Sequence, residues 1–443
     1  MGNLDKLSRE DLIKIILQLK VQVDALEEEN ADLRARLGGG GDAPAKPDWV
    51  KANRKQRREA ERADRKKRTQ SFVRKRDIPT EVVYHAVDNC PDCGRKLSGG
   101  WIHSRHQIIE LPQAPVRVIE NILVARRCGV CGKRHIPKLD LSGQVLGQSR
   151  FGIRLMSVIA SMAISCRMTN RLIKSILWSL YGLKISIGEI AQILHKVAQY
   201  GQVSYDKLLL AVRGSPVVNG DETGWREDGI NGYIWSFSTP DVRYFLYDHS
   251  RASCVAKEAL GDEFSGVLVS DFYGGYNFYD GVKQRCWVHL LRDLKKLVEK
   301  HPDNKSVDIW VKNIKLVFKQ AKKIAEQDLP QMARVRFRQQ LEAKLLELAS
   351  PYLGVKNAPQ RVLAKRIDNF LGELFTFVDI EGVPSDNNAA ERAVRPAVVL
   401  RKVTGGSRSP KGSDTKMVLM SLFGTWNIKG TNPISACTQM LAK

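Results

Sequence analysis

The sequence lacks the features of a membrane or secreted protein. Its 443 residues contain no apolar run approaching the roughly 18 residues that a membrane-spanning helix needs. The N-terminus shows no signal-peptide pattern, and Met1-Gly2 does not fit a myristoylation site because Lys6 stands where Ser or Thr is required. Cysteine is scarce, with eight residues. These absences predict a soluble cytoplasmic protein, with no membrane partner, whose cysteines are metal ligands or core thiols rather than disulfides.

Acidic residues are also in deficit. Lys and Arg number 71 against 48 Asp and Glu, so the formal net charge is +23. This excess favours a polyanionic partner, either nucleic acid or an anionic membrane. The length exceeds that of one typical domain, and about two to four domains are expected.

The N-terminal part carries a heptad repeat. Leucines and mostly branched residues recur every seven positions in two offset registers, namely Leu12, Leu19, Leu26 and Leu33, and Ile16, Val23, Asn30 and Leu37. This pattern predicts a parallel coiled-coil dimer within residues 4–37, with Asn30 fixing the register. The alternative is an amphipathic helix that packs on its own protein.

A linker and a basic tract follow the heptads. Residues 38–47 have the composition of a linker, and residues 46–76 hold fourteen Lys or Arg against four Asp or Glu. Such a run is either a solvated segment or one that contacts DNA phosphates. Its candidate DNA contacts are Arg54, Lys55, Arg57, Arg58, Arg65, Lys66, Lys67 and Arg68.

Two C-x-x-C-G turns come next, and they predict a zinc site. The four thiols, which together can hold one structural Zn²⁺ in a closed tetrahedral site, are Cys90, Cys93, Cys128 and Cys131. The 34 residues between the pairs are rich in β-branched side chains at 116–124, and the prolines at 112 and 115 predict a turn at 112–115. We therefore expect a zinc ribbon with a long hairpin. A redox role would need only one of the two pairs.

Residues 150–212 have apolar side chains at helical spacing. A turn at 181–186 contains Gly182, and Ser186 can cap a helix that begins at Ile187. A helix, a glycine-containing turn and a capped helix are typical of a helix-turn-helix unit that binds DNA, although any helical bundle gives the same pattern.

Two aspartates each follow a short apolar run that predicts a buried strand. They are Asp221 and Asp271, and between them lie an antiparallel meander of 233–238 and 242–247 and a helix over 253–260. This order of elements is the opening of a ribonuclease-H-like fold. In that topology the first and fourth strands are neighbours, so Asp221 is expected beside Asp271.

A third carboxylate lies in the segment between Pro384 and Pro396. Ser385 or Asp386 can cap a helix there, and Pro396 is expected to end it. One face of that helix carries Asn387, Asn388, Glu391 and Arg395. A carboxylate flanked by amides and a guanidinium is costly to bury without a function.

These three carboxylates have the chemistry of a metal-binding set. Hard divalent cations take carboxylate oxygens, and two ions about 4 Å apart can stabilise both the attacking and the leaving oxygen of a phosphodiester. We therefore predict that Asp221, Asp271 and Glu391 bind two Mg²⁺ (or Mn²⁺) ions. Glu222 is the rival ligand that the sequence leaves open.

In these contexts Asp221, Asp271 and Glu391 resemble the DDE triad of ribonuclease-H-like transposases. Residues 386–396 closely resemble the glutamate motif of the insertion-sequence 66 family, and the resemblance covers nearly the whole chain. It implies a DNA transposase that binds transposon ends and performs metal-dependent strand cleavage and strand transfer. It also implies a zinc-binding module where the C-x-x-C pairs lie, and helices inserted between the second aspartate and the glutamate.

Further residues can support this site. The family shows a Cys-x-x-His after its second aspartate, matched here by Cys286 and His289, which either support the site, position a phosphate, or are simply a buried thiol and a structural histidine. A basic segment rich in Gly and Ser near the C-terminus can approach phosphates closely. Its candidate DNA contacts are Arg401, Lys402, Arg408 and Lys411, and 415–426 is expected to form a closing helix.

The predicted chain is a multidomain α+β and α/β protein. Its parts are a coiled coil (1–41), a basic linker (42–80), a zinc ribbon (81–148), a helical DNA-binding domain (149–213), a ribonuclease-H-like core (214–289 and 381–443, the latter with the basic segment) and a helical insertion (290–380). The expected partners are double-stranded DNA, further copies of the chain in a homodimer or larger assembly, and accessory proteins of the same element, at the bacterial nucleoid. The alternatives are a non-catalytic zinc-containing DNA-binding protein derived from a transposase, and a two-carboxylate hydrolase such as a glycosidase, which leaves the positive charge unused.

Overall fold

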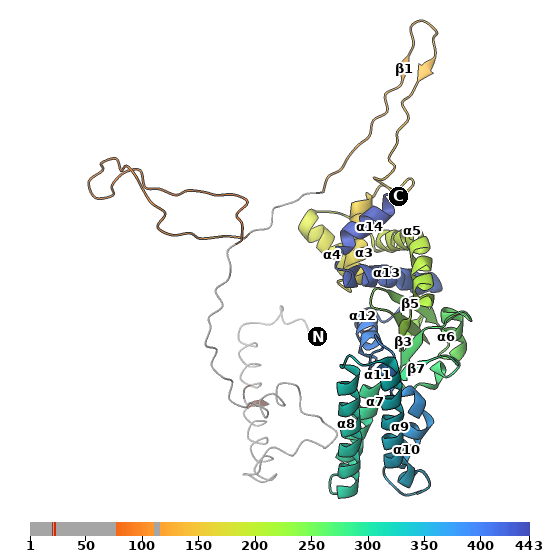
Figure 1. The fold of residues 1–443 in the computed structure, drawn as a ribbon. Helices are drawn as coiled ribbons and strands as arrows, with labels where there is room; N and C mark the ends of the chain where they lie inside the picture. The colour runs from red at the N-terminus through yellow and green to blue at the C-terminus, as the bar shows by residue number, and fades with distance from the viewer. Residues whose placement is uncertain (1–19, 21, 24–76, 110–115) are drawn as a thin grey trace. The chain divides into compact units, whose positions relative to one another are not determined.

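The computed structural model describes residues 20, 22–23, 77–109 and 116–443 (Figure 1). The predicted heptad dimer within 4–37 and the basic tract 46–76 lie almost wholly outside the described residues, as does the turn at 112–115. They stay predictions. The chain divides into two units, Met1–Glu110 and Leu111–Lys443, which are described separately.

Regular structure around the C-x-x-C turns is short. In the first unit an isolated bridge pairs Asn89 with Lys96. In the second, β1 (Arg126–Arg127) and β2 (Arg134–His135) pair antiparallel. Residues 116–124 form no strand, so the predicted long hairpin is wrong there. Their β-branched side chains are mostly exposed, and β-propensity alone does not form a strand without a surface to pack against.

A helical bundle follows β2 in the second unit and begins with α3 (Ile153–Ile164), α4 (Asn170–Tyr181) and α5 (Ile187–Arg213). The predicted turn and cap are confirmed, since Gly182 has a φ of 64° and Ser186 forms a capping box with Glu189. These helices share one core with α13 (Pro410–Ile428) and α14 (Pro433–Leu441) near the C-terminus (Figure 1). The closing helix therefore begins before 415, and α14 was not predicted.

A five-stranded mixed sheet lies between two sets of helices (Figure 1). Its strands are β3 (Val217–Glu227), β4 (Ile230–Ser238), β5 (Arg243–Asp248), β6 (Val267–Ser270) and β7 (Lys283–Arg285). The order is β5-β4-β3-β6-β7, antiparallel from β5 to β3 and parallel from β3 to β7. The predicted meander, the helix α6 (Ser253–Leu260) and the pairing of the first and fourth strands are confirmed. This is an α+β arrangement.

Strand β3 continues past Asp221, where the sequence was expected to end it. Its parallel pairing with β6 ends at Asn219, but its antiparallel pairing with β4 runs on to Glu227. The local preference of the polar residues and glycine after Asp221 is for a turn. Pairing with β4 outweighs this preference and keeps the segment in a strand. Gly220 is required here, because a Cβ at this position would lie 2.9 Å from the ring of Tyr276.

Helices fill the chain between β7 and the glutamate motif. The main ones are α7 (Trp287–Lys300), α8 (Lys305–Ala325), α9 (Gln331–Leu353), α10 (Arg361–Asn369) and α11 (Thr376–Asp379), with the 3-10 turn η3 (Leu371–Glu373). The 3-10 turn η2 (Gly274–Tyr276) lies earlier, between β6 and β7. The helices expected between the second aspartate and the glutamate are therefore present, with α8 and α9 the longest of them. Their shared core includes Val267 and Val269 of β6, which joins these helices to the sheet.

Helix α12 (Asn388–Thr404) carries the glutamate, and it does not end at Pro396 as predicted. A proline removes one backbone donor, while burial of Ala393, Ala397 and Leu400 in the core holds the helix together on both sides of it. The helix ends instead at Gly405, whose φ is 73°. The predicted caps are also revised, because Asn387 occupies the N-cap without a side-chain cap bond.

Candidate active site

Asp221 and Asp271 lie on neighbouring parallel strands. Asn219 of β3 pairs with Val269 of β6, and each aspartate comes two residues after its member of that pair. Successive side chains of a strand alternate between faces, so equal offsets from a paired position direct both carboxylates to the same side. The predicted neighbourhood of the two aspartates is thus supported by the strand register.

Asn387 fixes the start of α12 against β3. Its side chain is buried, donates to the Gly220 carbonyl oxygen at 2.7 Å and accepts from the Asn219 amide at 3.0 Å. Its backbone N–H contacts the Cys286 sulfur at 3.1 Å. Glu391 follows one turn later, and so these contacts bring its carboxylate toward the aspartates.

Negative charge at this site is only partly compensated. Burial, together with the charges of Glu222, Asp271 and Glu391, raises the pKa of Asp221 to about 7. One oxygen of Asp221 accepts the Glu222 N–H at 2.9 Å, and one oxygen of Asp271 accepts the Tyr273 N–H at 2.9 Å. Oε1 of Glu391 is buried and accepts no hydrogen bond.

Two basic side chains of α7 face Glu391. His289 Nε2 lies 3.6 Å and Arg292 Nη2 3.7 Å from Glu391 Oε1. Both distances are too long for a hydrogen bond. Arg292 is about half-exposed, with 47% of its side-chain surface accessible, and can reach a ligand placed beside the glutamate.

The donor chemistry of the three carboxylates fits divalent cations. They offer oxygen ligands, and the raised pKa of Asp221 together with the unbonded oxygen of Glu391 indicates a place where positive charge is missing. Within the part of the chain that the structure describes, no three His, Cys, Asp or Glu side chains are grouped closely enough to hold a metal ion. The oxygen atoms of these side chains are therefore ligands of the type that Mg²⁺ prefers. The three carboxylates are not close enough together to form a complete coordination sphere.

Glu222, the rival ligand, is engaged elsewhere. As the next residue along β3 it points to the opposite face from Asp221. Its side chain is 3% exposed, pairs with Arg251 at 2.5 Å and accepts the Tyr276 hydroxyl at 2.7 Å. Arg251 in turn lies 3.9 Å from the centre of the Tyr273 ring. Glu222 therefore anchors the loop that follows Asp271.

Arg285 is a positioning residue that the sequence did not reveal. Its guanidinium is fully buried, pairs with Glu373 at 2.5 Å and donates to the carbonyl oxygen of Asp271 at 2.8 Å. It also reaches the Ser270 hydroxyl at 3.0 Å and the Asn277 side chain at 2.6 Å. These bonds hold both ends of the loop that carries Asp271. The sequence analysis predicted no strand at β7, so nothing in the sequence marked this residue.

Cys286 and His289 lie beside the glutamate helix. Cys286 is buried at the N-cap of α7, and burial raises the pKa of its thiol. His289, one turn into α7, faces Glu391. Asn388 is the first residue of α12 and donates its N–H to Asp386 at 3.0 Å, while Arg395 is exposed one turn beyond Glu391.

The C-terminal basic residues divide into two groups. Arg401 contacts the Gly224 carbonyl oxygen and so helps to hold α12 on β3. Ser407 exchanges backbone hydrogen bonds with Arg226 and Asp228 at 2.8 and 2.9 Å, which fastens the segment after α12 to the β3–β4 hairpin. Three basic side chains are exposed here and available to an anion, namely Lys402 near the end of α12, Arg408 on this fixed segment and Lys411 in the first turn of α13.

The two C-x-x-C turns have matching geometry. In each, the first cysteine N–H bonds a carbonyl five residues on, and the glycine N–H bonds the first cysteine carbonyl. Gly94 and Gly132 have φ values of 72° and 65°, which only glycine adopts readily. Nearby N–H groups, first those of Cys93 and Cys131, lower the pKa of Cys90 and Cys128. Each turn thus favours a thiolate, and the four-thiolate site stays a prediction because each unit is described by itself.

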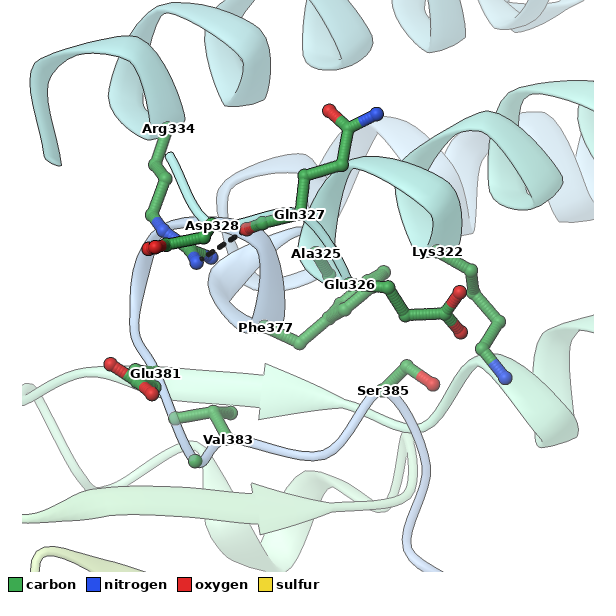
Figure 2. Close-up of a pocket in the computed structure, with 11 residues that line it drawn as sticks. Lys322, Ala325, Glu326, Gln327, Asp328, Arg334, Phe377, Glu381, Val383 and Ser385 are labelled. Carbon is green, nitrogen blue, oxygen red and sulfur yellow. Dashed lines mark hydrogen bonds between the residues drawn. The ribbon is translucent and has the colours of Figure 1, made fainter. Parts of the chain in front are cut away.

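A cavity of about 440 Å³ lies near the start of the glutamate motif. The end of α8, the start of α9 and residues 381–385 line it (Figure 2). Its lining mixes charges of both signs, with Arg334 donating to the Gln327 carbonyl oxygen at 2.8 Å. None of the three candidate carboxylates is among the lining residues, so this cavity is not the candidate site.

Comparison with known proteins agrees with the predicted resemblance. A family model described as "Transposase IS66 family" matches residues 148–415. Two similar curated proteins, both from Sinorhizobium fredii, are called "Uncharacterized protein y4jD" and "Uncharacterized protein y4qI". They are 23% identical over 298 residues and 24% identical over 294 residues, in each case 59% of this chain. The aligned parts are 57% and 54% of those relatives, so the chain spans about half the length of the curated relatives it matches. No helix among the described residues is long and apolar enough to cross a membrane.

Proposed function

The chain belongs to the IS66 family of transposases, and on that premise we propose that it cuts and joins DNA with Asp221, Asp271 and Glu391. The observation that carries the proposal is the strand register, in which Asp221 and Asp271 each follow the paired residues Asn219 and Val269 by two positions. Burial first, and then the charges of Glu222, Asp271 and Glu391, raise the pKa of Asp221 to about 7. The strand order β5-β4-β3-β6-β7 supports a ribonuclease-H-like core. The three carboxylates come from β3, from the loop after β6 and from α12.

In this proposal the three carboxylates hold two Mg²⁺ or Mn²⁺ ions. When bound, the ions would supply charge stabilisation and a lowered pKa for the attacking water. Asn387 holds α12 against β3, and Arg285 holds the backbone of Asp271, so the ligands are placed by groups behind them. His289 and Arg292 face Glu391 from α7 and are suited to contact the scissile phosphate.

The reaction consists of two in-line displacements at phosphorus. In the first, water attacks the phosphodiester at the transposon end and a 3′-hydroxyl leaves. In the second, that 3′-hydroxyl attacks a phosphodiester of the target and another 3′-hydroxyl leaves. No covalent bond between protein and DNA is needed, so we assign no Ser or Tyr nucleophile.

Binding of double-stranded DNA is proposed to use basic surfaces away from the carboxylates. Lys402, Arg408 and Lys411 are exposed, and the tract 46–76 adds further positive charge. We also propose one structural Zn²⁺ at the paired C-x-x-C turns, self-association through 4–37 and action on bacterial DNA. The domain layout from 1–41 to 381–443 is part of the same proposal.

The test is strand cleavage by the full chain. DNA from either side of its own gene copy is incubated with the protein and Mg²⁺, and nicks are mapped. Glu391→Gln keeps the shape and removes the charge, so cleavage should fall by several orders of magnitude while DNA affinity at fixed salt stays within about tenfold.

Glu222→Gln is the matched control, because an amide oxygen can still accept from Tyr276. It should retain much more activity than Glu391→Gln. Cleavage by Glu391→Gln at the wild-type rate, or inactivity of Glu222→Gln alone, would contradict the site assignment. A wild-type chain that binds these ends and never cuts them would favour the non-catalytic DNA-binding alternative.

A further inference from the structure

Residues 141–188 contain no acidic side chain. The same stretch holds six basic residues, namely Arg150, Arg154, Arg167, Arg171, Lys174 and Lys184. It includes all of α3 and α4, and the next acidic residue, Glu189, belongs to α5 and pairs with Arg150 at 2.9 Å. In a chain with 48 acidic residues, a gap of this length marks a surface suited to a polyanion.

Helix α4 has two distinct faces. Ile173 and Leu177 are buried in the core. The opposite face is exposed and presents side chains spaced by three, four and seven residues, namely Arg171, Lys174, Ser175 and Trp178. Trp178 is 53% exposed, and the ammonium of Lys184 lies 5.6 Å from the centre of its ring. A basic stripe with an exposed aromatic is typical of a nucleic-acid contact.

The connection between α3 and α4 is short and constrained. It spans 165–169, and Arg167 adopts a φ of 57°, which a non-glycine residue rarely takes. Thr169 then caps α4 by accepting the Leu172 N–H at 3.3 Å. The direction of α4 relative to α3 is therefore set by a tight turn, as in a helix-turn-helix unit.

This pair fits DNA better than the pair α4–α5 that the sequence suggested. In α4–α5 the second helix carries Glu189 in its first turn, and this carboxylate closes the capping box and would face the phosphates. The first turn of α4 has no acidic residue. A reading helix contacts DNA mainly with its N-terminal residues, so Arg171 and Lys174 are well placed and Glu189 is not.

We propose that α4 enters the major groove of duplex DNA, with Arg171 and Lys174 on phosphates or base edges and Trp178 against the backbone. The inference rests on the proposed function and names the surface by which the transposon end is recognised. An α-helix is about 10–12 Å across, which matches a major groove about 12 Å wide. A second copy of this chain, docking through Trp178, is the competing occupant.

The experiment compares two double variants of the full chain. Arg171→Ala/Lys174→Ala removes two charges from α4, and Lys315→Ala/Lys319→Ala removes two from equally exposed positions of α8. The probes are duplexes from either side of the gene copy and a duplex of equal length from its coding region. We expect the α4 variant to lose at least about tenfold in affinity for the end duplexes, with its salt dependence reduced by about two counterions.

Each outcome has a defined meaning. Thermal unfolding and light scattering are measured on both variants without DNA. Equal losses in the α4 and α8 variants would overturn the inference, and so would a change of oligomeric state in the α4 variant alone. A wild-type chain that binds ends through α4 and never cuts them would sink the proposed function and leave the inference standing. If the wild-type chain cuts these ends and the α4 variant binds them as well as the α8 variant does, the inference fails and the proposed function stands.

Discussion

Asp221→Asn should stabilise the metal-free protein while abolishing DNA cleavage. In the folded chain the pKa of Asp221 is about 7, compared with an ordinary value of 3.8, and burial is the largest cause. The folded state therefore holds this proton more tightly than the unfolded state does. Between these two pKa values the unfolded state binds fewer protons, so the free energy of unfolding falls as pH rises through this window.

The size of the effect follows from the shift. About three pKa units at roughly 1.36 kcal/mol each give an upper bound of about 4 kcal/mol of destabilisation above pH 7. Asparagine removes the charge and keeps an oxygen that accepts the Glu222 N–H. Burying its NH₂ group without a partner offsets part of the gain. We expect a net gain of about 1–3 kcal/mol at pH 8 and little difference at pH 4, where the aspartate is protonated.

Chemical denaturation with a chelator present measures this gain at both pH values. The control is Asp262→Asn, because the Asp262 side chain is 88% exposed and its removal should change little. Adding Mg²⁺ should stabilise the wild type, because the ions compensate the negative charge of Asp221. It should not stabilise Asp221→Asn, which lacks that charge. An Asp221→Asn chain that is less stable than wild type at pH 8, or a difference that does not depend on pH, would refute the reasoning.

Three other predictions test separate parts of the chain. Metal analysis of the reduced protein should give one Zn²⁺ per chain in the wild type and none in Cys93→Ser/Cys128→Ser, because both turns favour thiolates. Polar replacement of Leu19 and Leu26 should yield monomers or weaken DNA-end pairing in sedimentation, and an unchanged assembly would contradict the heptad prediction. Arg285→Lys keeps a charge and loses the forked bonds to the Asp271 loop, so the Mg²⁺ concentration for half-maximal cleavage should rise about 10–100-fold while DNA affinity stays constant. A loss of stability with an unchanged Mg²⁺ requirement would show that Arg285 does not position Asp271.

Features set by local preferences could be predicted from the sequence. The turn at Gly182, the capping box of Ser186 and the meander before Asp271 all depend on residues close together in the chain. Pro396 misled the prediction, because the packing of α12 on the sheet outweighs one lost backbone donor. The prediction of a strand at 116–124 was wrong because packing is missing there. β-branched residues without a surface to pack against do not form a strand.

The site itself required the fold, because its chemistry depends on which face each side chain takes. Asp221 and Glu222 are adjacent and chemically similar, so no sequence pattern separates them. On β3 they point to opposite sides, and only Glu222 meets Arg251 and Tyr276. A carboxylate already paired with a guanidinium and a phenol is poorly suited to bind a metal ion, whereas the pKa of Asp221 is raised by burial and by surrounding carboxylates. The difference between ligand and anchor therefore arises from the pleat of the strand. Glu222 and Arg285 are buried beneath the site and hold the Asp271 loop there. DNA does not need to reach that side of the loop.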